Sequence, residues 1–359
     1  MTRATRNRGE RRLAAAASLV AASLLLAGPA AAADAKHHWK MATGWGGGPL
    51  MDNSNCFADR VGLLSDGAIE VEVFPGGALG KALKVSDTVR SGAAEAGHTW
   101  MGYDWGRDRA VVVFAGFAGS MDSERSLHWI YQGGGAEMQN EYRQEVFGVV
   151  SIPLGVRTAE AFLHSNKPVR TMEDMQGLKL RTAGAWLEIT DGFGASPVTM
   201  PGSEVYTSLE RGVIDATEWG TLYENISSGF HKIAKYVMIP GVHQPMAMFE
   251  LVINPDAYAA LSDREKELVD IAARSCTMDM WLKVGHEDAK ALQFYKDEGN
   301  EIIVLEPEAQ QAMRQAALEW AEKQAQDSEW FRKAYDSQLA YEKAWKDAAD
   351  YRNVKTTQQ

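Results

Sequence analysis

Two apolar segments in the middle of the sequence are followed by polar side chains that could bind a small ligand. A predicted strand at residues 213–216 leads to Glu218 and Trp219. The next predicted strand leads through a Pro-Gly turn to His243 and Gln244. Open α/β sheets bind ligands beyond the carboxyl ends of their strands, so we expect these side chains to border one crevice. The oxygens of Glu218 and Gln244 suit a hard cation such as Ca²⁺, although spacing alone favours a structural Glu that accepts backbone hydrogen bonds.

Arg181 lies at the end of another predicted strand, residues 178–182. A guanidinium group donates two parallel hydrogen bonds to a carboxylate and stays charged at every relevant pH. The position suits either an anion-binding residue or a surface Arg paired with a nearby Glu, and spacing does not choose between them. Arg157 is a second candidate for contact with an anion.

The elements that must hold these residues follow a repeated pattern of strand, Pro-Gly turn, helix and strand. In one copy the turn begins at Pro75 and the helix ends at Gly92, and in the other these positions are Pro201 and Gly212. Two such units about 120 positions apart predict two lobes of similar α/β construction. The length of the chain also favours two domains. The ligand is then expected in the crevice between the lobes.

The first 33 residues have the pattern of a secretory leader. Five Arg precede an apolar segment that ends in an A-x-A signal, so we expect cleavage near Ala33 and a periplasmic mature protein. The apolar segment is too short and too rich in Ala for a retained membrane span. No later segment is apolar enough to cross a membrane.

The chain is acidic, with a formal net charge of −11, and removal of the Arg-rich leader makes it more so. This charge disfavours nucleic acid and anionic lipid as partners. An anionic small ligand must therefore meet a local basic side chain or a bound metal ion. The sequence contains neither H-E-x-x-H nor G-x-S-x-G, and no other pattern in it supports an enzyme.

Cys56 and Cys276 are the only cysteines of the chain. In an exported protein they could form a disulfide. Their separation by 220 positions and their helix-like surroundings are equally compatible with two buried free thiols. This count excludes a cysteine-ligated metal motif.

Three stretches of the sequence resemble the periplasmic solute-binding subunits of TRAP transporters, the DctP-type receptors. They are GLKLRTAG at 177–184, the segment 194–220 with its E-x-Y-x-x-L-x-x-G-x-I-D-A-x-E-W motif, and IPGVHQP at 239–245. The similarity runs from Trp39 to about Tyr351 and is greatest to the branch that binds 2-oxo or 2-hydroxy acids such as pyruvate and lactate with a metal ion. It implies an α/β fold of two lobes that close over the ligand, with crossing strands, a long connecting helix and a helical C-terminal extension.

The leader, the repeated pattern and the resemblance together predict how the chain is divided. The predicted parts are a leader at 1–33, a first lobe at 34–156 with a contribution from 246–306, a second lobe at 157–245, and a helical extension at 307–351.

The resemblance also implies roles for residues of the site. Arg181 takes the position that pairs with the ligand carboxylate, which favours the anion-binding role. The cation, Ca²⁺ or Na⁺, is expected to bind together with the ligand. Its implied ligands are Glu160, Glu218, the backbone carbonyl of Trp219 and Gln244. The branch has Gln at the first and Glu at the last of these positions, so the two changes together keep the charge of the set.

Two features of this chain depart from the branch. The crossing segment 155–162 lacks an Asn-Thr-Gly pattern and carries Arg157, which would add a second contact to the anion. Trp186 replaces small residues that are expected after Arg181. The other residues predicted to contact the ligand are Tyr103, Glu160, Trp219 and His243.

These observations predict a receptor, not an enzyme, that delivers a small organic acid to TRAP membrane subunits. The alternatives are a periplasmic metal-dependent enzyme acting on a 2-oxo acid and the ligand-sensing lobe of a signalling system. The segment 307–351 also predicts a two-fold dimer formed through its C-terminal helix. The predicted contact residues are Trp320, Trp330, Phe331 and Tyr335. The alternative is that this aromatic face packs against the chain's own lobes.

Overall fold

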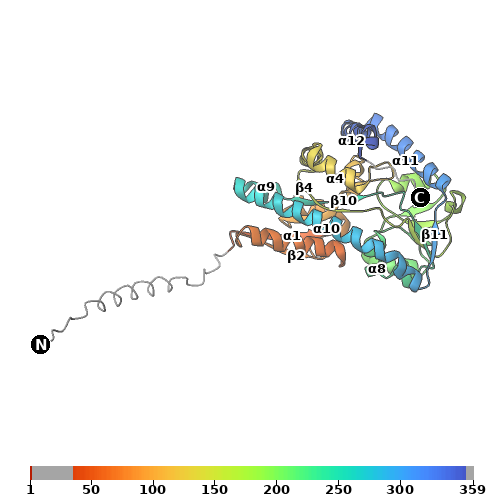
Figure 1. Ribbon diagram of the computed structural model, residues 1–359, viewed down its shortest axis with the longest axis horizontal. Helices are drawn as coiled ribbons and strands as arrows, with labels where there is room; N and C mark the ends of the chain where they lie inside the picture. The colour runs from red at the N-terminus through yellow and green to blue at the C-terminus, as the bar shows by residue number, and fades with distance from the viewer. Residues whose placement is uncertain (2–34, 353–359) are drawn as a thin grey trace.

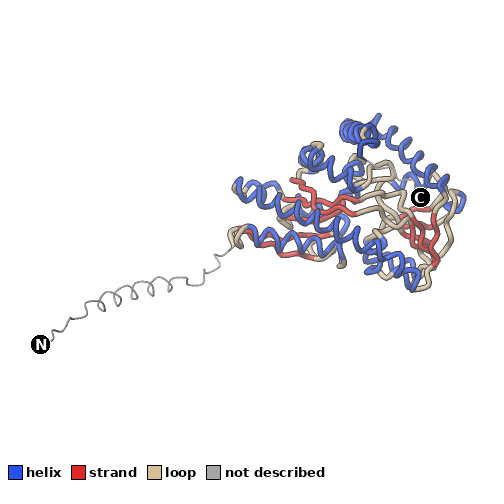
Figure 2. Tube along the Cα trace, in the orientation of Figure 1, coloured by secondary structure: helices blue, strands red, loops and turns tan. Residues whose placement is uncertain are grey.

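The computed structural model describes Met1 and residues 35–352, so the predicted leader lies outside the described residues apart from Met1. Two β-sheets, each covered by helices, form the two lobes of the molecule (Figure 1, Figure 2). The two-lobe α/β fold predicted from the sequence is therefore confirmed.

The first sheet consists of the strands β1 (His37–Thr43), β2 (Ile69–Phe74), β3 (Ala96–Trp100), β4 (Val150–Arg157) and β10 (Ala247–Ile253). Their order is β2-β1-β3-β10-β4. β1 is parallel to β2 and β3, whereas β10 runs antiparallel between β3 and β4. The return of the late strand β10 into this sheet places residues from two distant parts of the chain beside each other.

The second sheet consists of the strands β5 (Leu163–Ser165), β6 (Lys179–Arg181), β7 (Ser196–Val198), β8 (Ala216–Thr217), β9 (Tyr236–Ile239) and β11 (Glu301–Val304). Their order is β11-β9-β5-β8-β6-β7. β6 is parallel to both β7 and β8, and β5 runs antiparallel to both β8 and β9. The carboxyl ends of β6 and β8 therefore meet at one edge of the sheet.

Two details differ from the elements expected from the sequence. β11 pairs with β9 in the second sheet, although it lies within the 246–306 region predicted to join the first lobe. The predicted strand at 213–216 begins only at Ala216, because Gly212 has a φ of 69° and turns the chain. Val213 is 60% exposed in that turn.

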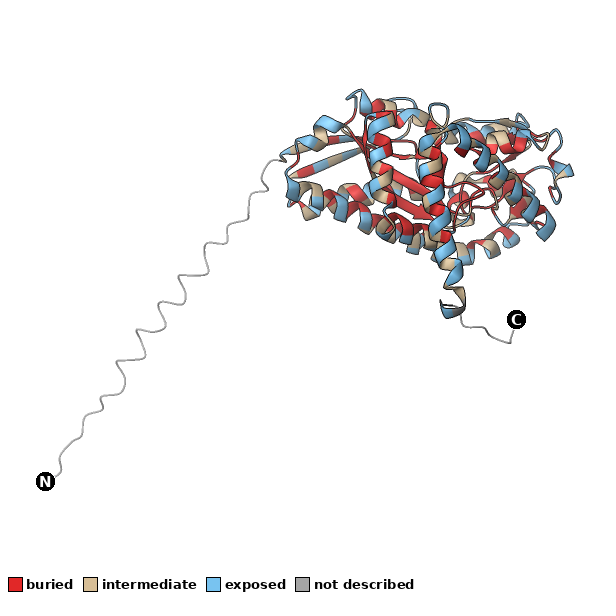
Figure 3. Cartoon of the chain, turned by 90° about the horizontal axis from the view of Figure 1, so that it is seen from above, coloured by how far each residue is buried: buried red, intermediate tan, exposed pale blue. Residues whose placement is uncertain are grey.

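Helices cover the sheets and connect the lobes. Figure 3 shows that the buried residues lie mainly on the strands and on the inward faces of these helices. The α-helices are α1 (Pro49–Leu64), α2 (Val85–Arg90), α3 (Val111–Ala115), α4 (Ser123–Gln132), α5 (Gly135–Tyr142), α6 (Trp186–Asp191), α7 (Gly202–Glu210), α8 (Leu222–Ser228), α9 (Pro255–Ala259), α10 (Asp263–Asp297), α11 (Pro307–Asp327), α12 (Glu329–Asp347) and α13 (Ala349–Arg352).

The helix α10 is the long connection between the lobes (Figure 1). It begins with a capping box in which Ser262 and Glu265 satisfy each other's backbone N–H groups. Its 35 residues span about 52 Å at 1.5 Å per residue. It contacts α1 and β4 of the first lobe and then α8 and β11 of the second. One rigid element thus sets the relative position of both lobes.

Two chain segments cross between the lobes in close contact with each other. The N–H of Glu160 in the first crossing donates to the carbonyl of Gln244 in the second at 3.1 Å. A Cβ on Gly241 would lie 2.1 Å from the carbonyl oxygen of Glu160, so only Gly permits this approach. The two crossings therefore bring Glu160 and Gln244 together at the junction of the lobes.

The C-terminal helices α11 and α12 pack against their own chain, α12 against α3, α4 and α5 of the first lobe and α11 also against α6 of the second. Phe331 and Tyr335 are 0% and 4% exposed. Trp320 Nε1 donates to Glu188 at 3.0 Å, and the ring centroid of Trp330 lies 5.4 Å from that of Tyr142. The four aromatic residues predicted to form a dimer contact are thus used for packing within the chain.

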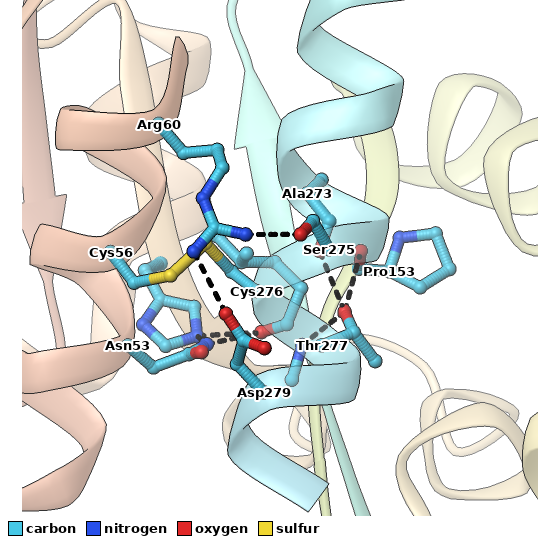
Figure 4. The surroundings of a disulfide bond; sticks show 12 residues. Asn53, Cys56, Arg60, Pro153, Ala273, Ser275, Cys276, Thr277 and Asp279 are labelled. Carbon is cyan, nitrogen blue, oxygen red and sulfur yellow. Dashed lines mark hydrogen bonds and ion pairs between the residues drawn. A yellow bond between two sulfur atoms is a disulfide. The ribbon is translucent and has the colours of Figure 1, made fainter. Parts of the chain in front are cut away.

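Cys56 on α1 and Cys276 on α10 form a disulfide, which settles the pairing that the sequence left open (Figure 4). Arg60, one turn after Cys56, donates to Asp279 at 2.8 Å and also contacts Ser275. The covalent bond and these polar contacts fix α1 to the part of α10 that covers the first sheet.

Removing the disulfide with the double substitution Cys56→Ala, Cys276→Ala is expected to lower the free energy of unfolding by about 2–4 kcal/mol. The bond closes a loop of 220 residues and so restricts the unfolded chain. Urea unfolding of the double variant and of oxidised wild type measures the difference, and wild type with a reductant serves as the control. Equal unfolding free energies for all three would contradict a stabilising disulfide.

Candidate functional site

A partly open cavity lies where the two lobes meet, and its roughly 390 Å³ of atom-free space includes adjoining solvent. Most of the residues predicted from the sequence line it, and Trp186 lies behind the wall with its ring centroid 5.9 Å from that of His243. The predicted residues in the wall are Tyr103, Arg157, Glu160, Arg181, Glu218, Trp219, His243 and Gln244. The wall residues that were not predicted are Trp45, Leu50, Trp100, Ala183 and Phe249.

Arg181 ends β6 and is 1% exposed. Its Nη1 donates to the backbone carbonyl and to Oε2 of Glu218, at 3.1 and 3.2 Å. Its Nη2 donates to the carbonyl of Met200 at 3.3 Å, and its Nε has no hydrogen-bond partner among the described residues. The guanidinium carbon lies 4.9 Å from the ring centroid of Trp219. Arg181 is therefore held in one orientation and keeps donor capacity that a carboxylate could use.

Glu218 directly follows β8, beside the end of β6. Its Oε1 accepts from the N–H of Ala183 at 2.9 Å, while Oε2 accepts from Arg181. The side chain is buried and lines the cavity. Both roles considered from the sequence, a structural Glu and a cation ligand, are compatible with this position. Glu218 accepts a backbone hydrogen bond and also faces the cavity.

Glu160 lies between two donors at the lobe crossing. Arg157 Nη2 contacts Oε1, and Nε2 of His243 donates to Oε2 at 3.1 Å. Burial alone would raise the pKa of Glu160, but the Arg157 guanidinium and the His243 hydrogen bond outweigh it and lower the pKa. Glu160 is therefore ionised in the neutral pH range.

Glu160, Glu218 and His243 form a cluster, called here the acidic cluster, that could hold a cation. One potential ligand atom from each lies within 4.8 Å of the others, and all three residues are buried. Gln244 lines the same space, and its Nε2 donates to the carbonyls of Ala115 and Met246 at 3.2 and 2.7 Å. The two carboxylates and the remaining amide oxygen are donors that suit Ca²⁺ or Na⁺, so the residues present fit such an ion.

The first lobe supplies the apolar side of the cavity. Trp45 Nε1 donates to Nδ1 of His98 at 3.0 Å, so Nε2 carries the imidazole proton and donates to the carbonyl of Leu154 at 2.9 Å. His98 is fully buried, and burial lowers its pKa to about 4. A neutral His98 therefore holds the Trp45 ring against the cavity.

His98 is expected to make the folded protein less stable as the pH falls from 6.5 to about 4. The unfolded chain protonates this side chain near pH 6.5 but the folded protein only near pH 4, so the unfolded state binds the extra proton between these values. The stabilisation is complete above pH 6.5, and about 3 kcal/mol of it is lost by pH 4. Urea unfolding of wild type and of His98→Asn at several pH values tests this expectation.

The same series with the exposed His286 changed to Asn is the matched control and should keep the wild-type pH dependence. If His98→Asn lost stability with falling pH as steeply as wild type, a neutral buried His98 would be the wrong description.

The family model for bacterial extracellular solute-binding protein, family 7 (DctP), matches residues 47–327. The chain belongs to this family. The resemblance to the DctP-type receptors of TRAP transporters is thereby confirmed, and the family consists of solute-binding receptors. Among the described residues, no helix combines the length and the apolar character that crossing a membrane requires.

Relatives with named ligands are similar over nearly the whole chain. The monocarboxylate 2-oxoacid-binding periplasmic protein all3028 of Nostoc sp. is 27% identical over 312 residues, 86% of this chain and 85% of that protein. The TRAP periplasmic solute binding protein of Pseudoalteromonas atlantica T6c, solved with sodium and pyruvate, is 29% identical with a TM-score of 0.81, over 88% of this chain and 97% of that one. Its counterpart from Colwellia psychrerythraea, solved with calcium and pyruvate, is 27% identical with a TM-score of 0.81, over 88% and 98%.

Proposed function

We propose that this DctP-family protein is a periplasmic receptor that binds a short 2-oxo monocarboxylate together with Ca²⁺ or Na⁺. The observation that carries the proposal is that Arg181 lines the same cavity as the acidic cluster. A site with both features offers a fixed cation for a carboxylate and oxygen ligands for a metal ion. The named ligands of the relatives, 2-oxo acids, pyruvate, sodium and calcium, support the same chemistry.

Arg181 receives the carboxylate of the acid in this proposal. Its guanidinium is already oriented by Glu218 and Met200, so binding does not require the side chain to be ordered first. A bound cation would link the carboxylate and keto oxygens of the acid to Glu160, Glu218 and Gln244. Glu218 contacts Arg181 directly, so the anion-binding and cation-binding parts of the site are physically connected.

The apolar wall supports a short ligand with an apolar end. Trp45, Leu50 and Phe249 are each no more than 6% exposed and face the charged side of the cavity. They exclude water from the ion pairs, which strengthens each charged contact in the site. They offer no partner for a second charged group at that end, which favours a monocarboxylate over a dicarboxylate.

The proposal includes delivery of the acid to the membrane subunits of a TRAP transporter and export of the chain after cleavage near Ala33. Mass spectrometry of small molecules released from the purified protein tests the receptor role, with elemental analysis for the metal. We expect an unmodified 2-oxo monocarboxylate and either calcium or sodium. Release of a converted product would instead support the enzyme alternative.

The two-fold dimer is a separate proposal. The four aromatic residues discussed above pack within the chain, and α12 also carries Leu339, which is 39% exposed and available for contact with a second copy. Light scattering of the mature protein at micromolar concentration measures the assembly. A mass of two chains is expected, and a mass of one chain would reject the dimer.

A further inference from the structure

Arg157 is bound to the oxygens that a cation in this site would need. Its Nη2 contacts Glu160 Oε1 and donates to the backbone carbonyl of Trp219 at 3.0 Å. Both oxygens belong to the predicted set of cation ligands. Arg157 is 6% exposed, and its guanidinium carbon lies 5.1 Å from the ring centroid of Phe249. These contacts are therefore shielded from water, where ion pairs are strong.

Arg157 has a second carboxylate partner outside the acidic cluster. Its Nη1 donates to Glu224 Oε2 at 2.9 Å. Glu224 is 3% exposed, and the same oxygen accepts the N–H of Thr221 in the capping box that begins α8. The helix cap holds Glu224 in place whether or not Glu160 keeps its contact. Arg157 therefore has a fixed anchor on one nitrogen and a partner on the other that a cation could take over.

The charges of the site explain why Glu160 needs a basic partner. A buried carboxylate without a partner is costly, because its lost hydration is not replaced. With neither a cation nor Arg157, Glu160 would have only the imidazole of His243 as a donor to its side chain. With Arg157 in contact, the carboxylate is neutralised by the chain itself.

We propose that Arg157 is the counterion of the cation-free site. Its Nη2 neutralises Glu160 and donates to the Trp219 carbonyl. A cation binds by replacing Nη2 at the Glu160 carboxylate and the Trp219 carbonyl oxygen, while Nη1 stays on Glu224. This inference rests on the proposed function, since it assigns the regulation of that same site. The Glu160 carboxylate has a positively charged partner before and after the exchange. The cavity can therefore form without the metal ion, because no buried carboxylate is left unpaired. The affinity for the cation is lowered because the guanidinium must be displaced.

The exchange also explains how the acid and the cation would assist each other. A guanidinium and a metal ion that compete for the same two oxygens cannot both keep them, and their positive charges repel at short distance. The carboxylate of the acid brings a negative charge to the cavity and so favours the state that holds the metal ion. Each ligand then raises the affinity for the other by the same factor.

Calorimetric titration with calcium chloride, without any organic acid, tests the proposal on the full mature chain. Arg157→Gln is expected to bind calcium about tenfold more tightly than wild type, or better, because no charged hydrogen bonds must be broken. Arg157→Lys should also bind calcium more tightly, by a smaller factor, since an ammonium on a shorter stem cannot bridge all three partners. Arg109→Gln removes the same charge from an exposed pair with Glu188 and should leave the affinity within about twofold.

Calcium affinities of Arg157→Gln and Arg157→Lys equal to or weaker than that of wild type would overturn the proposal, as would the absence of calcium binding to all variants. A crystal structure of calcium-loaded wild type provides a test that does not depend on the folding of a variant. The proposal requires Arg157 Nη2 to have left Glu160 while Nη1 remains on Glu224, and an intact Arg157–Glu160 contact beside a bound ion would refute it. The calcium titration contains no acid, so it does not test the proposed receptor function. A separate titration with acid tests that function, and a lack of acid binding by every variant would be its failure.

Discussion

Arg181→Ala is expected to weaken binding of the organic acid by about 100-fold or more. The substitution removes a buried charged donor from the carboxylate, and charged hydrogen bonds of this kind contribute about 1.5–3 kcal/mol each. It also leaves Glu218 with one neutral donor, Ala183 N–H, beside the incoming anion. Calorimetry with pyruvate and saturating calcium measures the change.

Two further variants make the result specific to the site. Arg181→Lys should also weaken binding, because an ammonium cannot donate two parallel hydrogen bonds to a carboxylate. Arg170→Ala removes an Arg whose ion pair with Glu301 lies at the surface, and it should bind pyruvate as wild type does. Unchanged affinity in Arg181→Ala would remove Arg181 from the role of anion-binding residue.

Glu218→Gln is expected to weaken the binding of the cation and of the acid together. It removes one negative charge from the acidic cluster and places an amide donor or a neutral oxygen opposite Arg181. A carboxylate ligand of a buried cation contributes at least as much as a charged hydrogen bond, so we expect roughly 100-fold weaker calcium binding. Since each ligand helps to hold the other, pyruvate affinity at fixed calcium should fall as well.

The matched control is Glu204→Gln, which makes the same change at an exposed position in the first turn of α7. It should leave both affinities unchanged. Glu218→Gln could weaken calcium binding while pyruvate affinity stays at the wild-type value, both with and without a chelator. The two parts of the site would then be independent, and the proposed coupling would be wrong.

The second lobe's part of the site was predictable because it depends on local order. Arg181 and Glu218 lie at the ends of two neighbouring parallel strands, so the strand pattern alone places their side chains at one edge of a sheet. The boundary of β8 was missed by three residues, since the apolar Val213 looks like a strand residue but lies in a turn. The strand direction, not its length, fixed the position of Glu218.

The first lobe's part of the site was not predictable in the same way. Trp45, Trp100 and Phe249 come from or directly after three strands of one sheet, and they reach the cavity only through the closure of the two lobes. The position of Trp45 just after β1 and of Trp100 at the end of β3 is the signal that could have suggested them. Long-range pairing of this kind leaves no periodic pattern in the sequence.

The partners of Arg157 and of the two cysteines illustrate the same limit. Arg157 was expected to meet an anionic ligand and lines the cavity, and its two Nη atoms contact Glu160 and Glu224, the latter 67 positions away. Cys56 and Cys276 have Cα atoms 6.0 Å apart only because α1 and α10 lie side by side on the first sheet. Spacing along the chain carries no information about either contact.

The most direct test of the receptor function is calorimetric titration of the ligand-free mature protein with pyruvate, in calcium and again after chelation in a buffer without sodium. We predict saturable binding of one pyruvate per chain at micromolar concentration or below with calcium, and at least tenfold weaker binding when both cations are removed. Pyruvate recovered from the cell should be chemically unchanged. Absence of binding in both buffers, or equal affinity in both, would contradict a receptor that holds a 2-oxo acid together with a cation.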